Sequence, residues 1–422
     1  MRHSLALLLL LVLALGCALD SLSSGNTAPS PADPHSKALE VQTRKVAAGI
    51  DVWARDGVPT WMKSKRLGLV TNNTGRTVGG KASVDAIRDM KDVTLVALFG
   101  PEHGIRSDVD ASVPDSIDPP TGLPVWSLYG KRRKPEPEQL KNVDVLVYDI
   151  QDIGARFYTY ISTMGNCMEA AAAAGIPFVV LDRPNPIAPA GIGGPLLDAG
   201  KESFTAWHRI PVMHGLTVGE LASLFVAERI PTLKLHVVRC EGWDPHFYHD
   251  QLGMQWINPS PNIRRLEQAL LYPGIGLLET TNVSVGRGTD TPFEIVGAPW
   301  INAIQLADAL RSQPAFAGMT VSPVAFTPTS STHKGVVCNG VRMSITNRCL
   351  ADPLTIGAAF GCTLRDLYGK KFAAEKWGRL LGNDASLQSF LAGCATEDLT
   401  KSWSIDAHAF EARRAPFLLY PR

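Results

Sequence analysis

The chain has 422 residues, of which 45% are hydrophobic and 19% are charged. This length and composition are sufficient for two folded domains with hydrophobic cores. The 41 basic and 40 acidic side chains leave a formal net charge of +1, so no electrostatic argument favours nucleic acid or an anionic membrane surface as a partner.

The N-terminus has the pattern of a secretory signal. Residues 1–18 start with a short basic stretch, continue with the unbroken apolar run 5–15 and end in small residues. We expect cleavage and export to the periplasm or cell envelope. The alternative is that Cys17 becomes a lipidated first residue, which would give the protein its one membrane contact. Residues 19–45 are rich in Ser, Pro, Ala and Asn and are predicted to form a disordered tether.

From residue 66 onward, short apolar runs alternate with helix-like stretches. Strands are predicted at 66–70, 93–99, 143–150 and 177–182. Helices are predicted at 83–90, at 157–174 and after a capping box formed by Thr217 and Glu220. Alternation of this kind predicts an α/β fold in which helices cover both faces of a parallel sheet.

Beyond residue 286 the pattern changes to that of a compact α+β unit. The predicted elements are a helix at 303–311, strands at 319–326 and 340–347, and helices at 355–368 and 387–392. We therefore divide the folded chain into a larger domain at 46–285 and a smaller C-terminal domain at 286–422 that closes a cleft. Cys338 and Cys349 flank the second strand and are the favoured disulfide pair, although a buried free cysteine is the commoner explanation for each.

Polar residues follow every predicted strand of the larger domain. The strand ends read TNNTGR (71–76), GPEHGIR (100–106), DIQDIGAR (149–156) and DRPNP (182–186). Ligands of open parallel sheets bind beyond the carboxyl ends of the strands, so these segments predict one shared polar crevice. The sequence has no GxGxxG after a strand and no GxxxxGK[ST], GxSxG or HExxH, so we expect no nucleotide, cofactor or metal there.

The residue types in this crevice are those that sugar recognition requires. Carboxylates and amides bind hydroxyl groups, aromatic rings cover sugar faces, and cleavage of a glycosidic bond needs a carboxylic acid beside a second carboxylate. The carboxylates at the strand ends are Glu102, Asp108, Asp149, Asp152 and Asp182. The glycine-bounded loop GRGTD (286–290) is interpreted as a further ligand loop, with a simple turn as the alternative.

Longer segments of the chain carry a family resemblance. They are FGPEHGIRSD (99–108), YDIQDIGARFYTY (148–160), LDRPNPI (181–187), IPVMHGLTVGELA (210–222) and the block 257–301. Together they resemble the NamZ/YbbC exo-β-N-acetylmuramidases. The resemblance implies a Rossmann-like domain carrying a smaller α/β domain. It also implies removal of N-acetylmuramic acid from the non-reducing ends of peptidoglycan fragments in cell-wall turnover and recycling. The alternative is a non-catalytic envelope protein that binds muropeptides.

The resemblance and the strand-end position together make Glu102 the predicted catalytic residue. His103 is expected to orient it or to bind substrate, with a role in satisfying loop carbonyls as the alternative. The second catalytic group stays open among Asp149, Asp152, Glu279 and Glu294. Arg106, Arg156 and Arg287 are candidates for binding the lactyl carboxylate of muramic acid, because a guanidinium fork suits a carboxylate. The remaining predicted substrate-binding residues are Asn72, Tyr158, Asn258, Asn262 and Asn282.

Overall fold

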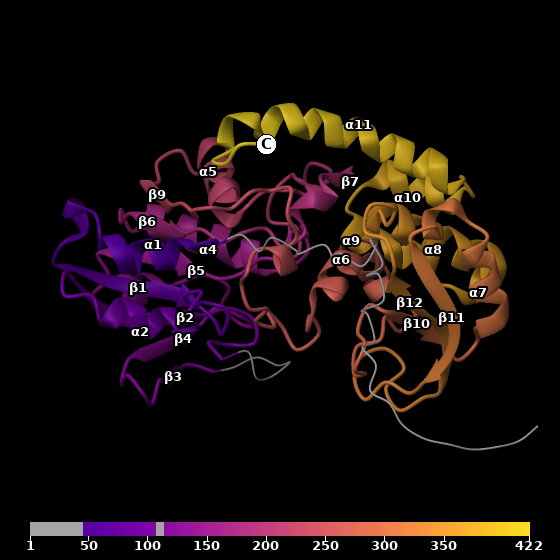
Figure 1. Cartoon of the computed structure of the whole chain (residues 1–422), viewed down its shortest axis with the longest axis horizontal. Helices are drawn as coiled ribbons and strands as arrows, with labels where there is room; N and C mark the ends of the chain where they lie inside the picture. The colour runs from indigo at the N-terminus through magenta and orange to yellow at the C-terminus, as the bar shows by residue number, and fades with distance from the viewer. Residues whose placement is uncertain (1–44, 107–113) are drawn as a thin grey trace, which may run out of the picture. The chain divides into compact units, whose positions relative to one another are not determined.

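A seven-stranded sheet organises the first part of the chain (Figure 1). Its strands are β1 (Lys65–Thr71), β2 (Val93–Gly100), β3 (Ser116–Ile117), β4 (Pro124–Ser127), β5 (Val145–Asp149), β6 (Phe178–Leu181) and β9 (Leu235–Val238). The order is β3-β4-β2-β1-β5-β6-β9, and all neighbours are parallel except β3 and β4. From β4 to β9 this is the 3-2-1-4-5-6 order of doubly wound sheets. The prediction of a mainly parallel α/β sheet is confirmed.

The computed structural model describes residues 45–106 and 114–422, which belong to one compact unit, Gln42–Arg422. The predicted signal sequence at 1–18, the lipid anchor at Cys17, the tether up to residue 44 and Asp108 lie outside the described residues.

Alternating side chains of the strands build two separate cores, one on each face of the sheet. In β5, Leu146 and Tyr148 belong to one core, whereas Val145 and Val147 belong to the other. The first core also contains side chains of α4 (Tyr160–Ala173) and α5 (Val218–Glu228). The second contains side chains of α1 (Gly49–Asp56) and α2 (Ser83–Arg88). The period of two along a strand thus explains why helices cover both faces, as predicted.

The predicted capping box is confirmed at the start of α5. The Thr217 hydroxyl accepts a hydrogen bond from the Glu220 backbone N–H at 3.1 Å, and the Thr217 N–H donates to Glu220 Oε2 at 3.0 Å. Helix α4 begins three residues later than predicted, because the N–H of Arg156 bonds to Val212 and that of Tyr158 closes a turn on Ala155. Residues 156–159 consequently form turns that precede the helix.

The second part of the chain contains a three-stranded antiparallel sheet of order β10-β12-β11. Its strands are β10 (Ile295–Ala298), β11 (Met319–Phe326) and β12 (Cys338–Ile345), and its helices include α7 (Ala303–Arg311), α8 (Pro353–Tyr368) and α10 (Asp384–Leu391). The smaller unit with an antiparallel sheet is confirmed. The favoured disulfide is wrong, because Cys338 and Cys349 are both free and only Cys338 is buried.

Two further helices pack against α8. Helix α6 (Leu266–Ile275) packs against α8 so closely that a Cβ atom on Gly357 would lie 2.5 Å from the Gly274 Cα. The long helix α11 (Thr396–Arg414) contacts α8 and the strand β7 (Gly193–Leu196) (Figure 1). None of the helices in the described ranges combines the length and apolar character needed to cross a membrane.

Candidate active site

One pocket gathers side chains from both parts of the chain beside the carboxyl ends of the sheet strands. Its lining comes from Glu102 and His103, from residues 157–160, from Ser260, Asn262 and Ile263, and from Tyr272, Glu279, Arg287 and Phe293. Six of the predicted site residues meet here: Glu102, His103, Tyr158, Asn262, Glu279 and Arg287.

Glu102 lies in the turn that follows β2 and is half-buried. Its Oε2 accepts a hydrogen bond of 2.6 Å from the Thr159 hydroxyl, which comes from the segment just before α4. Within the described part of the chain no hydrogen bond reaches Oε1. One carboxyl oxygen is therefore held in place while the other is available to a ligand.

The backbone of this turn is tightly constrained. His103 and Gly104 both have left-handed conformations, with φ values of 69° and 71°, and the Gly104 N–H bonds to the Pro101 carbonyl at 2.9 Å. A positive φ is uncommon for histidine and persists where the surrounding structure demands it. The His103 side chain is only 8% exposed and lines the pocket next to Glu102.

Aromatic rings form a continuous wall of the pocket. The Tyr158 ring lies 4.9 Å from Tyr160 and 5.8 Å from Tyr272, and Tyr272 lies 4.8 Å from Phe293, all measured between ring centroids. Burial raises the pKa of Tyr158 and of Tyr272 well above the ordinary tyrosine value, so both hydroxyls remain protonated donors. The Tyr160 hydroxyl donates to the Pro259 carbonyl and ties the 258–262 loop to α4.

Glu279 and Arg287 form the charged side of the pocket. The Arg287 guanidinium donates to Glu279 Oε1, and both side chains are partly buried. Of the three arginines considered for a carboxylate ligand, only Arg287 lines this pocket. The loop 286–290, predicted to contact a ligand, supplies this arginine.

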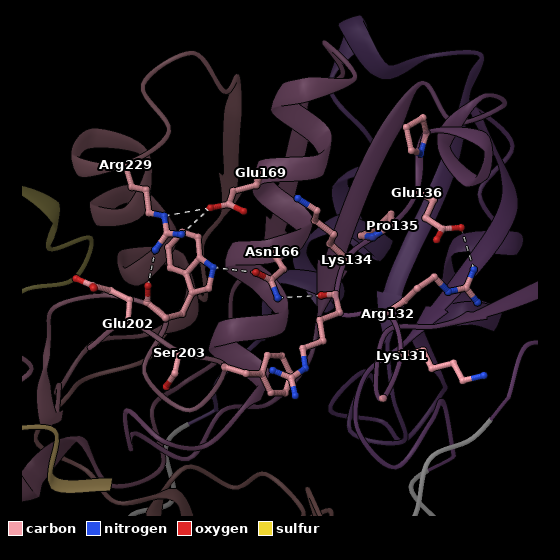
Figure 2. A pocket seen from close by; sticks show the side chains of 15 residues that line it. Lys131, Arg132, Lys134, Pro135, Glu136, Asn166, Glu169, Glu202, Ser203 and Arg229 are labelled. Atoms are coloured by element: carbon pink, nitrogen blue, oxygen red, sulfur yellow. Dashed lines mark hydrogen bonds and ion pairs between the residues drawn. The ribbon is translucent and has the colours of Figure 1, made fainter. Parts of the chain in front are cut away.

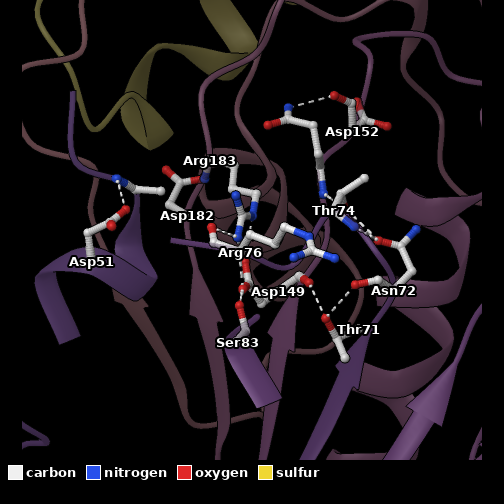
Figure 3. A network of polar contacts seen from close by, with 12 residues as sticks. Asp51, Thr71, Asn72, Thr74, Arg76, Ser83, Asp149, Asp152, Asp182 and Arg183 are labelled. Atoms are coloured by element: carbon white, nitrogen blue, oxygen red, sulfur yellow. Dashed lines mark hydrogen bonds and ion pairs between the residues drawn. The ribbon is translucent and has the colours of Figure 1, made fainter. Parts of the chain in front are cut away.

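Asp149 is placed elsewhere, at the carboxyl end of β5 and fully buried (Figure 3). Arg183 donates to both of its oxygens, at 2.6 and 2.9 Å, and the Ser83 hydroxyl also donates to it. Both oxygens of Asp149 are thus engaged by internal donors in a bidentate pair. The pair joins the end of β5 to the segment that follows β6. Asp149 therefore lies outside the pocket, in an internal ion pair with Arg183.

Arg156 and Asp152 are also interior residues. The Arg156 guanidinium is fully buried and donates to four backbone carbonyls, those of Pro195, Ile210, Leu380 and Leu381, at 2.7–3.0 Å. Asp152 accepts from the Gly154 N–H at 2.7 Å and faces His214 Nε2 at 3.3 Å. Neither residue lines the pocket, and the two terminal nitrogens of the Arg156 guanidinium are already bonded to backbone carbonyls.

The remaining predicted site residues form hydrogen bonds or ion pairs within the protein, outside the catalytic pocket, and two of them line another cavity. Asn282 bridges the Lys371 carbonyl and the Ala373 N–H, each at 2.8 Å, and Glu294 pairs with Arg265. Asn72 and Arg106 line a second polar cavity, in which Asn72 accepts from Thr74 and Arg106 pairs with Asp118 at 2.6 Å. Asn258 is exposed, and its carbonyl accepts from Asn73 at 2.9 Å.

Sequence reasoning overlooked Thr159, Tyr160, Tyr272 and Phe293 as pocket residues. Thr159 and Tyr160 are neighbours in sequence of Arg156 and Tyr158, which were predicted to bind substrate. This proximity was the only sequence signal that could have identified them. Tyr272 lies inside α6 and looks like an ordinary core residue in its apolar helix. Among the residues described by the structure, no group of three or more His, Cys, Asp or Glu side chains has a metal-binding arrangement.

Comparisons with known proteins identify the family of the chain. Residues 67–267 match the family model "Exo-beta-N-acetylmuramidase NamZ, N-terminal", and residues 270–420 match the corresponding C-terminal model. The chain is 42% identical over 401 residues to the peptidoglycan beta-N-acetylmuramidase NamZ of Bacillus subtilis (strain 168), covering 94% of this chain and 96% of that protein.

Solved structures show the same fold. A DUF1343 family protein from Bacteroides fragilis superimposes with a TM-score of 0.81 at 38% identity, and another from the same organism with 0.72 at 30%. Each comparison covers 89% of this chain and 99% of the other.

Proposed function

Because the chain belongs to the NamZ exo-β-N-acetylmuramidase family, we propose that it releases N-acetylmuramic acid from the non-reducing ends of peptidoglycan fragments. The observation that carries the proposal is the pocket in which Glu102, held by Thr159, lies with the Glu279–Arg287 pair and an aromatic wall. Most glycosidases cleave the glycosidic bond with two carboxylic residues that flank it. Aromatic rings beside them can cover the face of the sugar.

Glu102 acts as the general acid in this proposal. The Thr159 hydroxyl positions Oε2, and the other oxygen delivers its proton to the glycosidic oxygen as that oxygen leaves the anomeric carbon of the muramic acid. Water supplies the hydroxyl that the anomeric carbon carries in the product. Glu279 lines the same pocket and is the second catalytic carboxylate of this proposal. The alternatives predicted from the sequence were Asp149, Asp152 and Glu294. His103 adjoins Glu102 in a constrained turn and supports its orientation.

Arg287 supplies the recognition of muramic acid. The lactyl carboxylate distinguishes this sugar from glucosamine, and a guanidinium binds a carboxylate through two parallel hydrogen bonds. The hydrogen bond to Glu279 orients the Arg287 guanidinium before the substrate binds. The lactyl carboxylate therefore binds to a guanidinium group that is already in position. The loop 258–262, tied down by Tyr160, limits the pocket on another side and favours binding of a chain end.

Export and a role in cell-wall turnover complete the proposal. They are supported by the secretory pattern of residues 1–18 and by the location of peptidoglycan outside the cytoplasmic membrane. The division of the chain at residue 285 and the lipidation of Cys17 also stand as proposals from the sequence.

A chromogenic β-N-acetylmuraminide tests the activity directly. The wild-type protein should release the chromophore, whereas Glu102→Gln should keep its fold and lose about 10²- to 10⁴-fold in kcat, the usual contribution of a positioned acid. Glu138→Gln, at an exposed carboxylate on α3 (Pro137–Leu140), is the matched control and should be fully active. Binding without turnover by the wild type would instead support the non-catalytic alternative, and an active Glu102→Gln would move the acid to Glu279.

A further inference from the structure

A second cavity, of about 750 Å³, shares no lining residue with the catalytic pocket. We call it the basic groove, and its walls are residues 130–137, Asn166, Glu169, residues 202–204, Trp207 and Arg229 (Figure 2). The run Lys131 to Lys134 reads KRRK and contributes four of the five cations of the groove, against three carboxylates. The proposed reaction uses none of these residues.

Three of these cations have no acidic partner. Arg132 and Arg229 pair with carboxylates of the protein. By contrast, Lys131, Arg133 and Lys134 are exposed and form no ion pair with any residue that the structure describes. In Figure 2 the ammonium groups of the two lysines carry no contact to the other residues drawn. The groove therefore offers uncompensated positive charge to an anionic ligand.

The same walls carry groups that bind hydroxyls. Glu202 is exposed and forms no ion pair within the described ranges, and the exposed hydroxyl of Ser203 follows it in sequence (Figure 2). Carboxylates and hydroxyls accept hydrogen bonds from sugar hydroxyl groups, whereas a carboxylate repels a continuous polyanion. The mixture of charges therefore suits a ligand that has many hydroxyl groups and few negative charges.

The groove is also held in a defined shape. The Asn166 side chain donates to the Arg133 carbonyl at 2.9 Å and accepts from the Trp207 indole N–H at 2.9 Å, so it joins two walls (Figure 2). The Arg133 guanidinium lies 4.5 Å above the Phe204 ring, and that of Arg229 lies 3.9 Å above Trp207. Both guanidinium groups are thus placed by aromatic stacking before any ligand binds.

The glycan of the proposed function has this composition once its peptides have been removed. A stem peptide is attached through the lactyl carboxylate, so a terminal muramic acid that binds Arg287 through that carboxylate carries no peptide. In a chain freed of its peptides, every other muramic acid carries the same carboxylate among neutral hydroxyl and acetamido groups. Such a chain is rich in hydroxyls and sparsely anionic along its whole length.

We propose that the basic groove is a second binding site for peptide-free glycan, which it holds at muramic acid units other than the one being cleaved. Arg133, Lys131 and Lys134 bind the lactyl carboxylate, and Glu202 accepts hydrogen bonds from sugar hydroxyls. The inference rests on the proposed function. It does not require one chain to reach both cavities, because an enzyme held on any strand of the polymer meets chain ends at a raised local concentration.

A peptide-free glycan that ends in N-acetylglucosamine tests the groove without catalysis, because it offers the catalytic pocket no terminal muramic acid. Calorimetry should show that wild-type protein binds this glycan. The triple variant Lys131→Gln/Arg133→Gln/Lys134→Gln should bind it roughly 5- to 50-fold more weakly, because exposed ion pairs each contribute modestly. The same glycan with its carboxyl groups reduced to alcohols keeps its sugars and should bind wild-type protein as weakly as the intact glycan binds the variant.

Catalysis gives a second measurement. On long peptide-free glycan that ends in N-acetylmuramic acid, kcat/KM of the triple variant should fall roughly 3- to 10-fold, since the catalytic pocket still meets chain ends by diffusion. Its activity on the chromogenic muraminide should be unchanged. The matched control is Lys65→Gln/Arg88→Gln/Lys91→Gln, three exposed cations without ion pairs among the described residues, and it should act like wild type in every assay.

Equal affinity of the wild type and the triple variant for the intact glycan would overturn the inference, as would equal binding of intact and reduced glycan to the wild type. Binding of a glycerol-phosphate polymer but not of the glycan would also overturn it, in favour of a phosphate polymer in the groove. Failure of the wild type to cleave the muraminide would contradict the proposed function alone, because binding of the glycan that ends in N-acetylglucosamine needs no turnover.

Discussion

A single hydroxyl positions the carboxyl group on which the proposed chemistry depends. Replacing Thr159 by the isosteric Val removes the 2.6 Å hydrogen bond to Glu102 without emptying space. We expect kcat on the chromogenic muraminide to fall about 10-fold, since a hydrogen bond to a charged or ionising group is worth more than a neutral one. Thr159→Ser keeps the hydroxyl and should restore most of the rate. Wild-type kcat in Thr159→Val would show that Glu102 is positioned by other groups.

Arg287 should determine which sugar is accepted. Arg287→Gln should lower kcat/KM for the β-N-acetylmuraminide by about 10- to 100-fold, because it removes a charged partner of the lactyl carboxylate. The matching β-N-acetylglucosaminide has no such carboxylate, so its much lower turnover should change little. The ratio of the two kcat/KM values is the measurement, and Arg287→Lys should recover only part of it. An unchanged ratio would assign sugar selection to another residue.

The pocket residues could be predicted from sequence only where strand-end position and residue type sufficed. Glu102 follows a Gly-Pro break after an apolar run, and the structure places it in the pocket. Asp149 has an equally good position, yet its partner Arg183 is 34 positions away and turns it into a buried ion pair. A polar side chain at a strand end looks the same in sequence whether it faces a ligand or an internal partner.

At the scale of elements, the contact between α6 and α8 depends on two glycines that touch. A Cβ atom on Gly357 would lie 2.5 Å from the Gly274 Cα, which only a shift of backbone could relieve. Gly357→Ala should therefore lower the free energy of unfolding by about 1–3 kcal/mol, as overpacking does. Gly361→Ala, one turn further along α8, meets only side-chain atoms at 3.5–3.6 Å and should be neutral or slightly stabilising. Urea denaturation compares the two, and equal stabilities would contradict the close packing.

Helices and strands with a clear hydrophobic periodicity were predicted well. Helix α11, which lacks such a periodicity, was not predicted. The helix at 303–311 and the strand at 319–326 have the predicted bounds, since each combines clear periodicity with polar flanks. Helix α11 was not predicted, although it spans 19 residues, because it buries only Leu399, Trp403, Phe410 and Arg414. Residues far away in sequence hold the helix in place, as when Arg414 donates to the Gly215 carbonyl at 2.7 Å. Such tertiary contacts have no local sequence signal.

At the scale of the whole molecule, the C-terminal segment forms hydrogen bonds with residues that follow strands of the first sheet. The Tyr420 hydroxyl donates to Asp182 Oδ2 at 2.6 Å and accepts from the Cys240 N–H at 2.8 Å. Asp182 is fully buried after β6 and also accepts from the Thr217 hydroxyl at 2.8 Å. Burial raises the pKa of this carboxyl from 3.8 to about 6.

This raised pKa makes stability depend on pH. Between about pH 4 and pH 6 the folded protein holds a proton on Asp182 that the unfolded chain has released, so this group's contribution falls as the pH rises. Above pH 6 the Asp182 carboxylate is ionised, and the hydrogen bonds from Tyr420 and Thr217 then stabilise a buried negative charge. Tyr420→Phe should therefore reduce the free energy of unfolding by about 1–2 kcal/mol more at pH 8 than at pH 5.

Chemical denaturation at the two pH values measures this difference. Tyr148→Phe is the control, because the Tyr148 hydroxyl is equally buried but donates to the neutral Tyr160 carbonyl at 3.2 Å. Its loss should be the same at both pH values. A pH-independent loss in Tyr420→Phe would mean that Asp182 does not titrate in this range.

The distance in sequence between these partners has a consequence for biosynthesis. Tyr420 follows Asp182 by 238 positions, and Leu419, whose N–H donates to Glu220, follows that residue by 199. At 5–20 residues per second, about 10 to 40 s pass between synthesis of the sheet and arrival of its last partners. Until the C-terminal segment is available, the buried Asp182 carboxyl lacks its tyrosine donor, so this part of the interior forms only after the whole chain has been made.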